Sequence, residues 1–136
     1  NKSTYYKMYI EDFKDEYYKE FDNISDFNRN LIKYFLYELD IDTKVYLSSE
    51  LIKKDVKGAD RIMSILKKLK ATKYITGSGS GSVRYINEDD FKKANIKLEW
   101  QNYTHPVYEQ RYGDFLPYMN ILDLLFNVGP YSDQVI

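Results

Sequence analysis

Cysteine is absent from this sequence of 136 residues, and histidine occurs only once, at position 105. Without cysteine the chain has neither a disulfide framework nor a thiolate metal site, which fits a reducing compartment. A single histidine also excludes a metal centre that needs several imidazole ligands. The sequence therefore predicts no metal site, and it identifies no cofactor.

A net charge of either sign is also missing. The 20 Lys and Arg residues almost balance the 21 Asp and Glu residues, so no overall field attracts nucleic acid or an acidic membrane. The basic clusters are short: Lys53, Lys54 and Lys57, then Lys67, Lys68 and Lys70. We therefore expect no nucleic-acid partner.

No apolar run approaches the roughly 20 residues that span a bilayer, and no signal peptide is visible. These two absences predict a cytoplasmic protein without a membrane span. The chain begins with Asn1 rather than Met, so we expect an upstream portion of the same protein.

Two stretches near the start place apolar residues at helical spacing. The first contains Ile10, Phe13, Tyr17 and Phe21, and the second contains Ile24, Phe27, Leu31, Tyr34, Phe35 and Leu39. Ser25 can cap the second helix, and Asp26 lies in its first turn. The pattern predicts an N-terminal helical pair with a charged outer face.

Three later segments are typical of short β-strands. They read TKVYLS at 43–48, TKYIT at 72–76 and IKLEW at 96–100. A polar turn at 53–58 and a helix over 59–70 separate the first two, and a shorter helix that Asn87 can cap and Asn95 can end precedes the third. This alternation predicts an α/β fold, with a small, mainly parallel sheet of about three strands flanked by helices. The length favours a single domain over residues 1–136.

Residues 77–82 read GSGSGS, a low-complexity stretch. We interpret it as a flexible or engineered loop rather than a phosphate-binding loop. Neither a Walker A motif nor the G-x-G-x-x-G spacing is present, although Arg84 follows closely.

The segment at 102–130 joins a polar, aromatic loop to a short and very apolar helix, which we expect to be buried. Asn120 can cap this helix, with Asp123 at its third position, and Gly129 and Pro130 can end it. A loop fixed by such a helix is a usual place for a binding or catalytic site.

The loop and the neighbouring elements contain several candidate site residues, each of which also has a structural explanation. His105 is the natural base because its unperturbed pKa lies near neutrality, but a histidine before proline often only hydrogen-bonds its own loop. Tyr108 and Tyr112 can bind a sugar or pack beneath the loop. Arg61 can hold a phosphate or pair with a carboxylate. Asp123 and Asn127, one helical turn apart, can meet this loop, although capping also explains Asp123.

Several motifs resemble the C-terminal part of the WbqC-like family, bacterial proteins often associated with O-antigen and other surface-polysaccharide gene clusters. They are YLSSE (46–50), GADRI (58–62), ATKYITG (71–77), RYINEDDF (84–91), HPVY (105–108), QRYGDF (110–115) and ILDLLFNVGP (121–130). An N-terminal family segment reading roughly H-Q-P-x-Y-x-P-W-x-G-Y has no counterpart here. We therefore expect a fragment of a longer protein, whose missing segment or a partner enzyme completes it.

The resemblance implies a role in surface-polysaccharide biosynthesis, with group transfer to a nucleotide-linked or amino sugar. In this hypothesis the protein is a transferase, with His105 and Asp123 catalytic. Arg61 and Arg84 bind an anionic group of the substrate, and the other substrate contacts are Tyr108, Tyr112 and Asn127. The alternative is a non-catalytic binding or scaffolding module for a partner enzyme or a glycan carrier.

Overall fold

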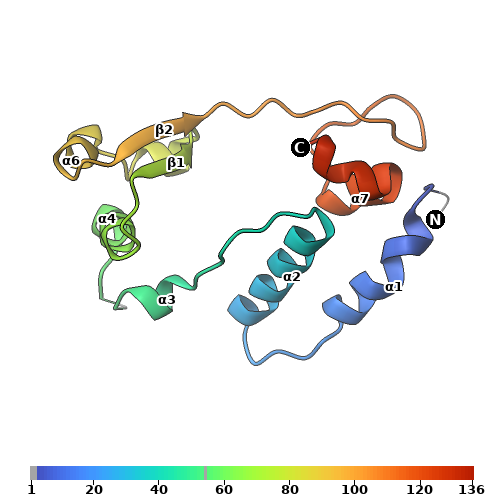
Figure 1. Ribbon diagram of the computed structural model, residues 1–136, viewed down its shortest axis with the longest axis horizontal. Coiled ribbons are helices and arrows are strands. Elements are labelled where there is room, and N and C mark those ends of the chain that lie inside the picture. The colour runs from blue at the N-terminus through green and yellow to red at the C-terminus, as the bar shows by residue number, and fades with distance from the viewer. Residues whose placement is uncertain (1–2, 54) are drawn as a thin grey trace. The chain divides into compact units, whose positions relative to one another are not determined.

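The structure is a computed structural model, and it describes residues 3–53 and 55–136. The chain divides into two compact units (Figure 1). Unit 1 comprises Asn1–Val45 and His105–Ile136, and unit 2 comprises Tyr46–Thr104.

Unit 1 is helical. Its elements are α1 (Tyr6–Tyr17), α2 (Ile24–Glu38), α7 (Ile121–Val128) and the 3-10 helix η1 (Gly129–Gln134). Helices α1 and α2 lie side by side, which confirms the expected helical pair (Figure 1). The first helix starts earlier than its apolar pattern indicates and ends before Phe21. Asn23 rather than Ser25 caps α2, because extended backbone at Asn23 lets its side chain accept from the amide of Asp26 at 3.0 Å, whereas Ser25 is already helical.

The core of unit 1 joins both ends of the chain. Tyr9, Leu39 and Leu125 are buried together, and the side chain of Leu125 is fully enclosed. The amide of Tyr5 donates to the carbonyl of Phe126 at 2.9 Å, which ties the segment before α1 to α7. Leu124 and Leu125 of α7 are thus buried, as its apolar run predicts, and the helix fixes the end of the loop that precedes it.

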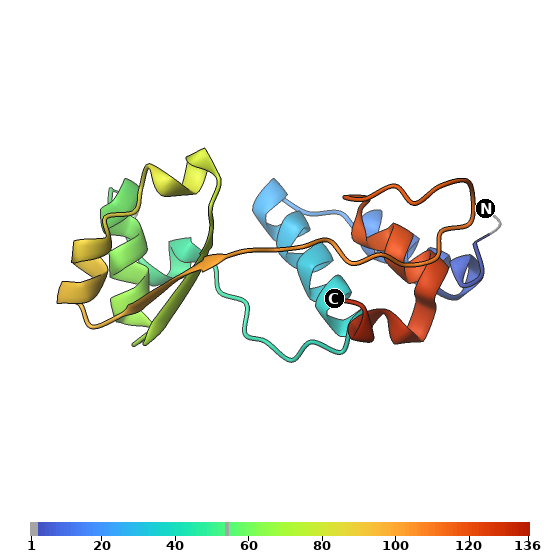
Figure 2. The same ribbon diagram turned by 90° about the horizontal axis from the view of Figure 1, so that it is seen from above.

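Unit 2 contains a parallel pair of strands. Its elements are α3 (Ser48–Leu51), α4 (Gly58–Lys68), β1 (Lys73–Gly77), α5 (Ser80–Val83), α6 (Glu88–Lys93) and β2 (Lys97–Gln101). Strand β1 runs parallel to β2, with Lys73 opposite Lys97. Figure 2 shows α4 and α6 on the same side of the strands, where Leu66, Phe91 and Ile96 form the core. On the other face Glu99 pairs with Lys73 at 3.2 Å, so that face is solvated.

The predicted α/β class is confirmed, with a parallel sheet flanked by helices, but one expected strand is wrong. Residues 43–47 are irregular and Ser48 begins α3, so the sheet has two strands within the described residues. The side chains of Thr43, Lys44 and Tyr46 are exposed and no strand pairs with them, so β-propensity alone does not produce a strand. The expected turn at 53–58 includes Lys54, which lies outside the described residues.

The helix boundaries in unit 2 follow the sequence more closely. The side chain of Asn87 accepts from the amide of Asp89 at 3.1 Å and caps α6, and Asn95 adopts the expected left-handed conformation with φ 55°. In the GSGSGS stretch, Gly77 ends β1 and Ser80 starts α5.

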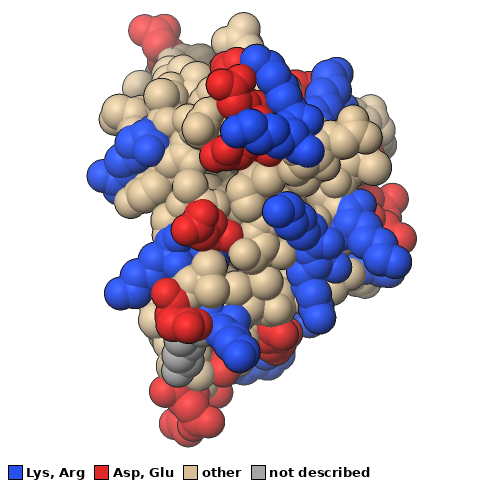
Figure 3. Space-filling view, turned by 90° about the vertical axis from the view of Figure 1, so that its left-hand side faces the viewer, with Lys and Arg blue, Asp and Glu red and all other residues tan. Residues whose placement is uncertain are grey.

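Charged side chains of both signs share the surface. On the face that Figure 3 shows, Lys and Arg lie among Asp and Glu and form no continuous field of one sign. Among the residues that the structure describes, no helix combines the length and the apolar character needed to cross a bilayer.

Candidate functional site

Asp123 in α7 is the centre of a hydrogen-bond network in unit 1. Its Oδ2 accepts from the Tyr108 hydroxyl and from Gln110 Nε2, both at 2.9 Å. Its Oδ1 accepts from Asn127 Nδ2 at 3.2 Å, and its amide donates to Asn120 Oδ1 at 3.3 Å. The capping role expected for Asn120 is therefore confirmed, and the structure brings three of the predicted site residues, Tyr108, Asp123 and Asn127, into direct contact.

Gln110 fastens the loop to this centre. Besides its bond to Asp123, its Nε2 donates to the carbonyl of Leu116 at 3.0 Å, and its Oε1 accepts from the amide of Leu116 at 2.8 Å. One side chain therefore closes the loop on itself and joins it to α7. The loop owes its shape to side-chain bonds, since it contains no strand or helix between residues 105 and 120.

Two adjoining hollows lie beside this network. The larger, of about 290 Å³, is lined by Ser3, Gln110, Arg111, Tyr112, Leu116, Met119, Asp123 and Asn127. The smaller, of about 110 Å³, is lined by Thr4, Glu109, Gln110, Arg111 and Asn127. We call the larger one the Asp123 hollow. It combines a carboxylate, two amides, a guanidinium and an exposed aromatic ring, a set that can bind a polar ligand with an apolar face.

His105 lies among aromatic rings. Its Nδ1 is 2.7 Å from the carbonyl oxygen of Pro106. Because a carbonyl oxygen can only accept a hydrogen bond, this contact places the proton of the neutral ring on Nδ1. Nε2 is then the basic nitrogen. The ring centroid lies 6.2 Å from that of Tyr108 and 5.2 Å from that of Tyr118. His105 does not line the Asp123 hollow, although it packs against Tyr108, which does bond to Asp123. Its role as a base stays a prediction.

Arg61 and Arg84 belong to unit 2. The Arg61 guanidinium donates to the carbonyls of Lys53 and Val56 at 2.9 and 3.1 Å and to Ser48 Oγ at 3.1 Å, so it holds the segment before α4 in place. The Arg84 guanidinium lies 4.7 Å from the centre of the Tyr85 ring. These contacts give Arg61 a structural task, and anion binding by the two arginines stays a prediction.

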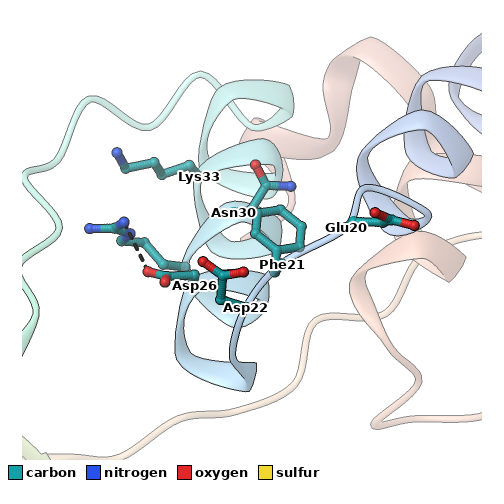
Figure 4. A pocket seen from close by; sticks show the side chains of 7 residues that line it. Glu20, Phe21, Asp22, Asp26, Asn30 and Lys33 are labelled. Atoms are coloured by element: carbon teal, nitrogen blue, oxygen red, sulfur yellow. Dashed lines mark hydrogen bonds and ion pairs between the residues drawn. The ribbon is translucent and has the colours of Figure 1, made fainter.

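A third hollow, of about 350 Å³, lies beside the turn between α1 and α2 (Figure 4). Its lining residues are Glu20, Phe21, Asp22, Asp26, Arg29, Asn30 and Lys33. Several of its polar groups already bond to protein atoms: Arg29 pairs with Asp26 at 3.0 Å, and Asn30 donates to Glu16 Oε2 at 2.8 Å. These pairs explain the polar side chains as parts of the turn, and none of the predicted site residues lies here.

Two residues that line both hollows, Gln110 and Arg111, were not among the site residues predicted from the sequence. Both belong to the QRYGDF motif and both line each hollow beside α7. Their position two and three residues after Tyr108 in an irregular loop was the available signal. In unit 1 Arg111 is the guanidinium that lines the hollow, whereas the predicted anion ligands lie in unit 2.

Comparison with known proteins places these motifs in a wider match. The sequence model of the WbqC-like protein family matches residues 1–135, so the resemblance includes the first helices and is not limited to a C-terminal part. The uncharacterized protein Rv1507c of Mycobacterium tuberculosis is 34% identical over 108 residues, which are 79% of this chain and 46% of that protein. The chain thus spans about half the length of this curated relative. No solved structure matches the chain.

Proposed function

The chain belongs to the WbqC-like protein family, and we propose that it takes part in bacterial surface-polysaccharide (O-antigen) biosynthesis by binding a nucleotide-linked or amino sugar for group transfer. The Asp123 hollow is the observation that carries this proposal. The Asn127 amide oxygen and the remaining acceptor position of Asp123 can accept from sugar hydroxyls, and the Tyr112 ring, which is 66% exposed, offers a flat apolar face. The proposed setting is the cytoplasm.

The proposed roles follow the network. Asp123 and Asn127 contact the sugar, and Tyr112 positions it. Tyr108 holds the Asp123 carboxylate and packs against His105, the proposed base. A base must come within hydrogen-bond reach of the proton it removes, so a bound substrate has to extend from the hollow to the imidazole.

The second candidate is a non-catalytic module that binds a glycan or its carrier for a partner enzyme. The observation that favours it is the position of His105, outside the set of residues that line the Asp123 hollow. The two candidates share the binding site and differ in the need for His105. Replacing His105 by Gln abolishes group transfer in the first case, and in the second case it leaves transfer by the partner enzyme intact.

The binding site itself is tested by titrating the chain with a panel of nucleoside-diphosphate sugars and amino sugars. Specific binding raises the free energy of unfolding with the logarithm of ligand concentration, by about 2.7 kcal/mol at one hundred times Kd, and the melting temperature rises with it. In NMR spectra we expect the largest shifts at the amides of Tyr112 and Asn127. If no member of the panel binds, or if the shifts lie in the α1–α2 turn instead, the proposed function is wrong.

A further inference from the structure

Each of the two hollows beside α7 is lined by both a carboxylate and a guanidinium. Asp123 lines the larger hollow, Glu109 lines the smaller one, and Arg111 lines both. Among residues 3–53 and 55–136, neither Asp123 nor Arg111 has an ion-pair partner within 4.0 Å. A ligand of this site therefore meets both a carboxylate and a guanidinium that lack a partner of opposite charge.

The Asp123 carboxylate is almost filled by neutral donors. A carboxylate offers about four acceptor positions, and Tyr108, Gln110 and Asn127 occupy three of them. None of these donors carries a charge, so the negative charge of Asp123 remains while only one acceptor position is left. A single ammonium group both fills that position and neutralises the charge. A hydroxyl group can fill the position but leaves the charge in place.

Arg111 is suited to a phosphate. Its guanidinium is free of hydrogen bonds within the described part of the chain and lies 5.9 Å from the centre of the Tyr112 ring. A planar guanidinium binds two phosphate oxygens in parallel. The nearby charges, two carboxylates against one guanidinium, repel a ligand that carries only a phosphate, and they favour one that also carries a cation.

We infer that the ligand of this site is a phosphate-linked amino sugar with a free amine, which places the ammonium at Asp123 and the phosphate at Arg111. The inference rests on the proposed function and narrows its substrate class. The sugar ring lies in the larger hollow against Tyr112, Leu116 and Met119. A neutral sugar lacks both charges, and an N-acetylated sugar lacks the ammonium.

Three small probes separate the two charges. The chain is titrated by calorimetry at pH 6.5 with glucosamine 1-phosphate, glucose 1-phosphate and glucosamine. Glucosamine 1-phosphate binds most tightly, and removal of either the amine or the phosphate weakens binding about tenfold, as expected for one partly exposed charge-assisted hydrogen bond. Altering the ligand rather than Asp123 keeps the network of α7 intact.

Two arginine variants locate the phosphate. In Arg111→Gln, glucosamine 1-phosphate and glucosamine bind equally, because the group that recognises the phosphate is gone. Arg29→Gln is the control, since Arg29 also belongs to unit 1 but pairs with Asp26 at 3.0 Å beside the hollow of the α1–α2 turn. This control keeps the about tenfold preference for the phosphate.

The outcomes distinguish the inference from the function on which it rests. If glucosamine binds as tightly as its 1-phosphate, or if glucose 1-phosphate matches glucosamine 1-phosphate, the inference is wrong and a sugar site still stands. The inference is also wrong if Arg111→Gln keeps the phosphate preference, if Arg29→Gln removes it, or if a nucleotide sugar without an amine binds while all three probes fail. If neither the probes nor the nucleotide sugars bind, the proposed function fails as well.

Discussion

The contacts inside unit 1 and those inside unit 2 differ in how far apart their residues lie in the sequence. In unit 1, Tyr5 bonds to Phe126 and the core combines Tyr9, Leu39 and Leu125, so residues more than a hundred positions apart in the sequence meet. In unit 2 the core comes from α4, α6 and β2, which follow one another along one continuous segment. The candidate site thus belongs to the unit that depends on closure between distant segments.

The two units also use polar side chains for the same purpose in different places. Gln110 fastens the loop before α7, and Arg61 fastens the segment before α4. In unit 1 the fastened loop borders the hollows, whereas in unit 2 the fastened segment leads into a core helix. Side-chain hydrogen bonds to the backbone thus shape a candidate binding site in unit 1 and support helix packing in unit 2.

The largest effect is expected where the closure of unit 1 is tightest. Gly129 has φ 68°, and a Cβ at this position overlaps the Tyr5 ring, so Gly129→Ala lowers the free energy of unfolding by about 4 kcal/mol. Gly113→Ala is the control, because Gly113 has φ 65° but open space around it, and its loss is about 1 kcal/mol. Urea denaturation measures both. Equal losses for the two variants contradict the closure of unit 1 by Tyr5.

The next effect tests whether the units unfold together. Leu125→Ala in unit 1 and Leu66→Ala in unit 2 each remove a buried leucine and cost about 3 kcal/mol. The expectation of a single domain predicts one transition that both variants lower. Thermal unfolding followed by circular dichroism and by tyrosine fluorescence measures it. Two transitions, with only one shifted by each variant, refute the single-domain expectation.

A smaller effect compares the two fastening side chains. Gln110→Ala removes three hydrogen bonds and costs about 1 to 2 kcal/mol, and it weakens ligand binding because the wall of the hollow loosens. Arg61→Ala costs a similar amount of stability but leaves ligand affinity unchanged. Calorimetric titration of both variants decides. A loss of affinity in Arg61→Ala supports the anion role predicted from the sequence.

The smallest effect is the pH dependence of stability. The fold raises the pKa of one carboxyl group in unit 1 and lowers the pKa of one in unit 2. Burial, and then repulsion by Asp12, raise the pKa of Glu38, so its protonation favours the folded state. That contribution is present below the unfolded pKa and is lost as pH rises through the raised folded pKa. Glu38→Gln therefore stabilises the protein at neutral pH by a few tenths of a kcal/mol after solvent screening, and not at acidic pH.

Glu99 responds in the other direction. Hydrogen bonds and attraction from Lys73, and then from Lys97, lower its pKa, so its contribution is present above the unfolded pKa and is lost as pH falls through the folded pKa. NMR titration of the two side-chain carboxyl carbons measures the shifts directly. If both pKa values move in the same direction, this contrast between the units is wrong.

The sequence predicts the elements that depend on local signals. Asn87 and Asn120 cap their helices as expected, and the strands at 72–76 and 96–100 form within a residue of their predicted limits. The segment at 43–48 fails because a strand needs a partner, which no local pattern supplies.

The site follows the same division between local and distant contacts. The expected meeting of Tyr108, Asp123 and Asn127 depends on α7 following the loop closely, and the sequence reveals it. The role of Gln110 in shaping the loop depends on its two hydrogen bonds to Leu116. The loop is irregular, so no periodic pattern in the sequence predicts these bonds. The structural task of Arg61 is hidden for the same reason, because its partners are mostly backbone carbonyls.

The discontinuity of unit 1 has a consequence for synthesis on the ribosome. Residues 46–104 emerge together, so β1 can pair with β2 while α1 and α2 still await α7. Until residues 105–136 are translated, Tyr9 and Leu39 lack the buried contact with Leu125, and this interval is when a chaperone has the most to bind.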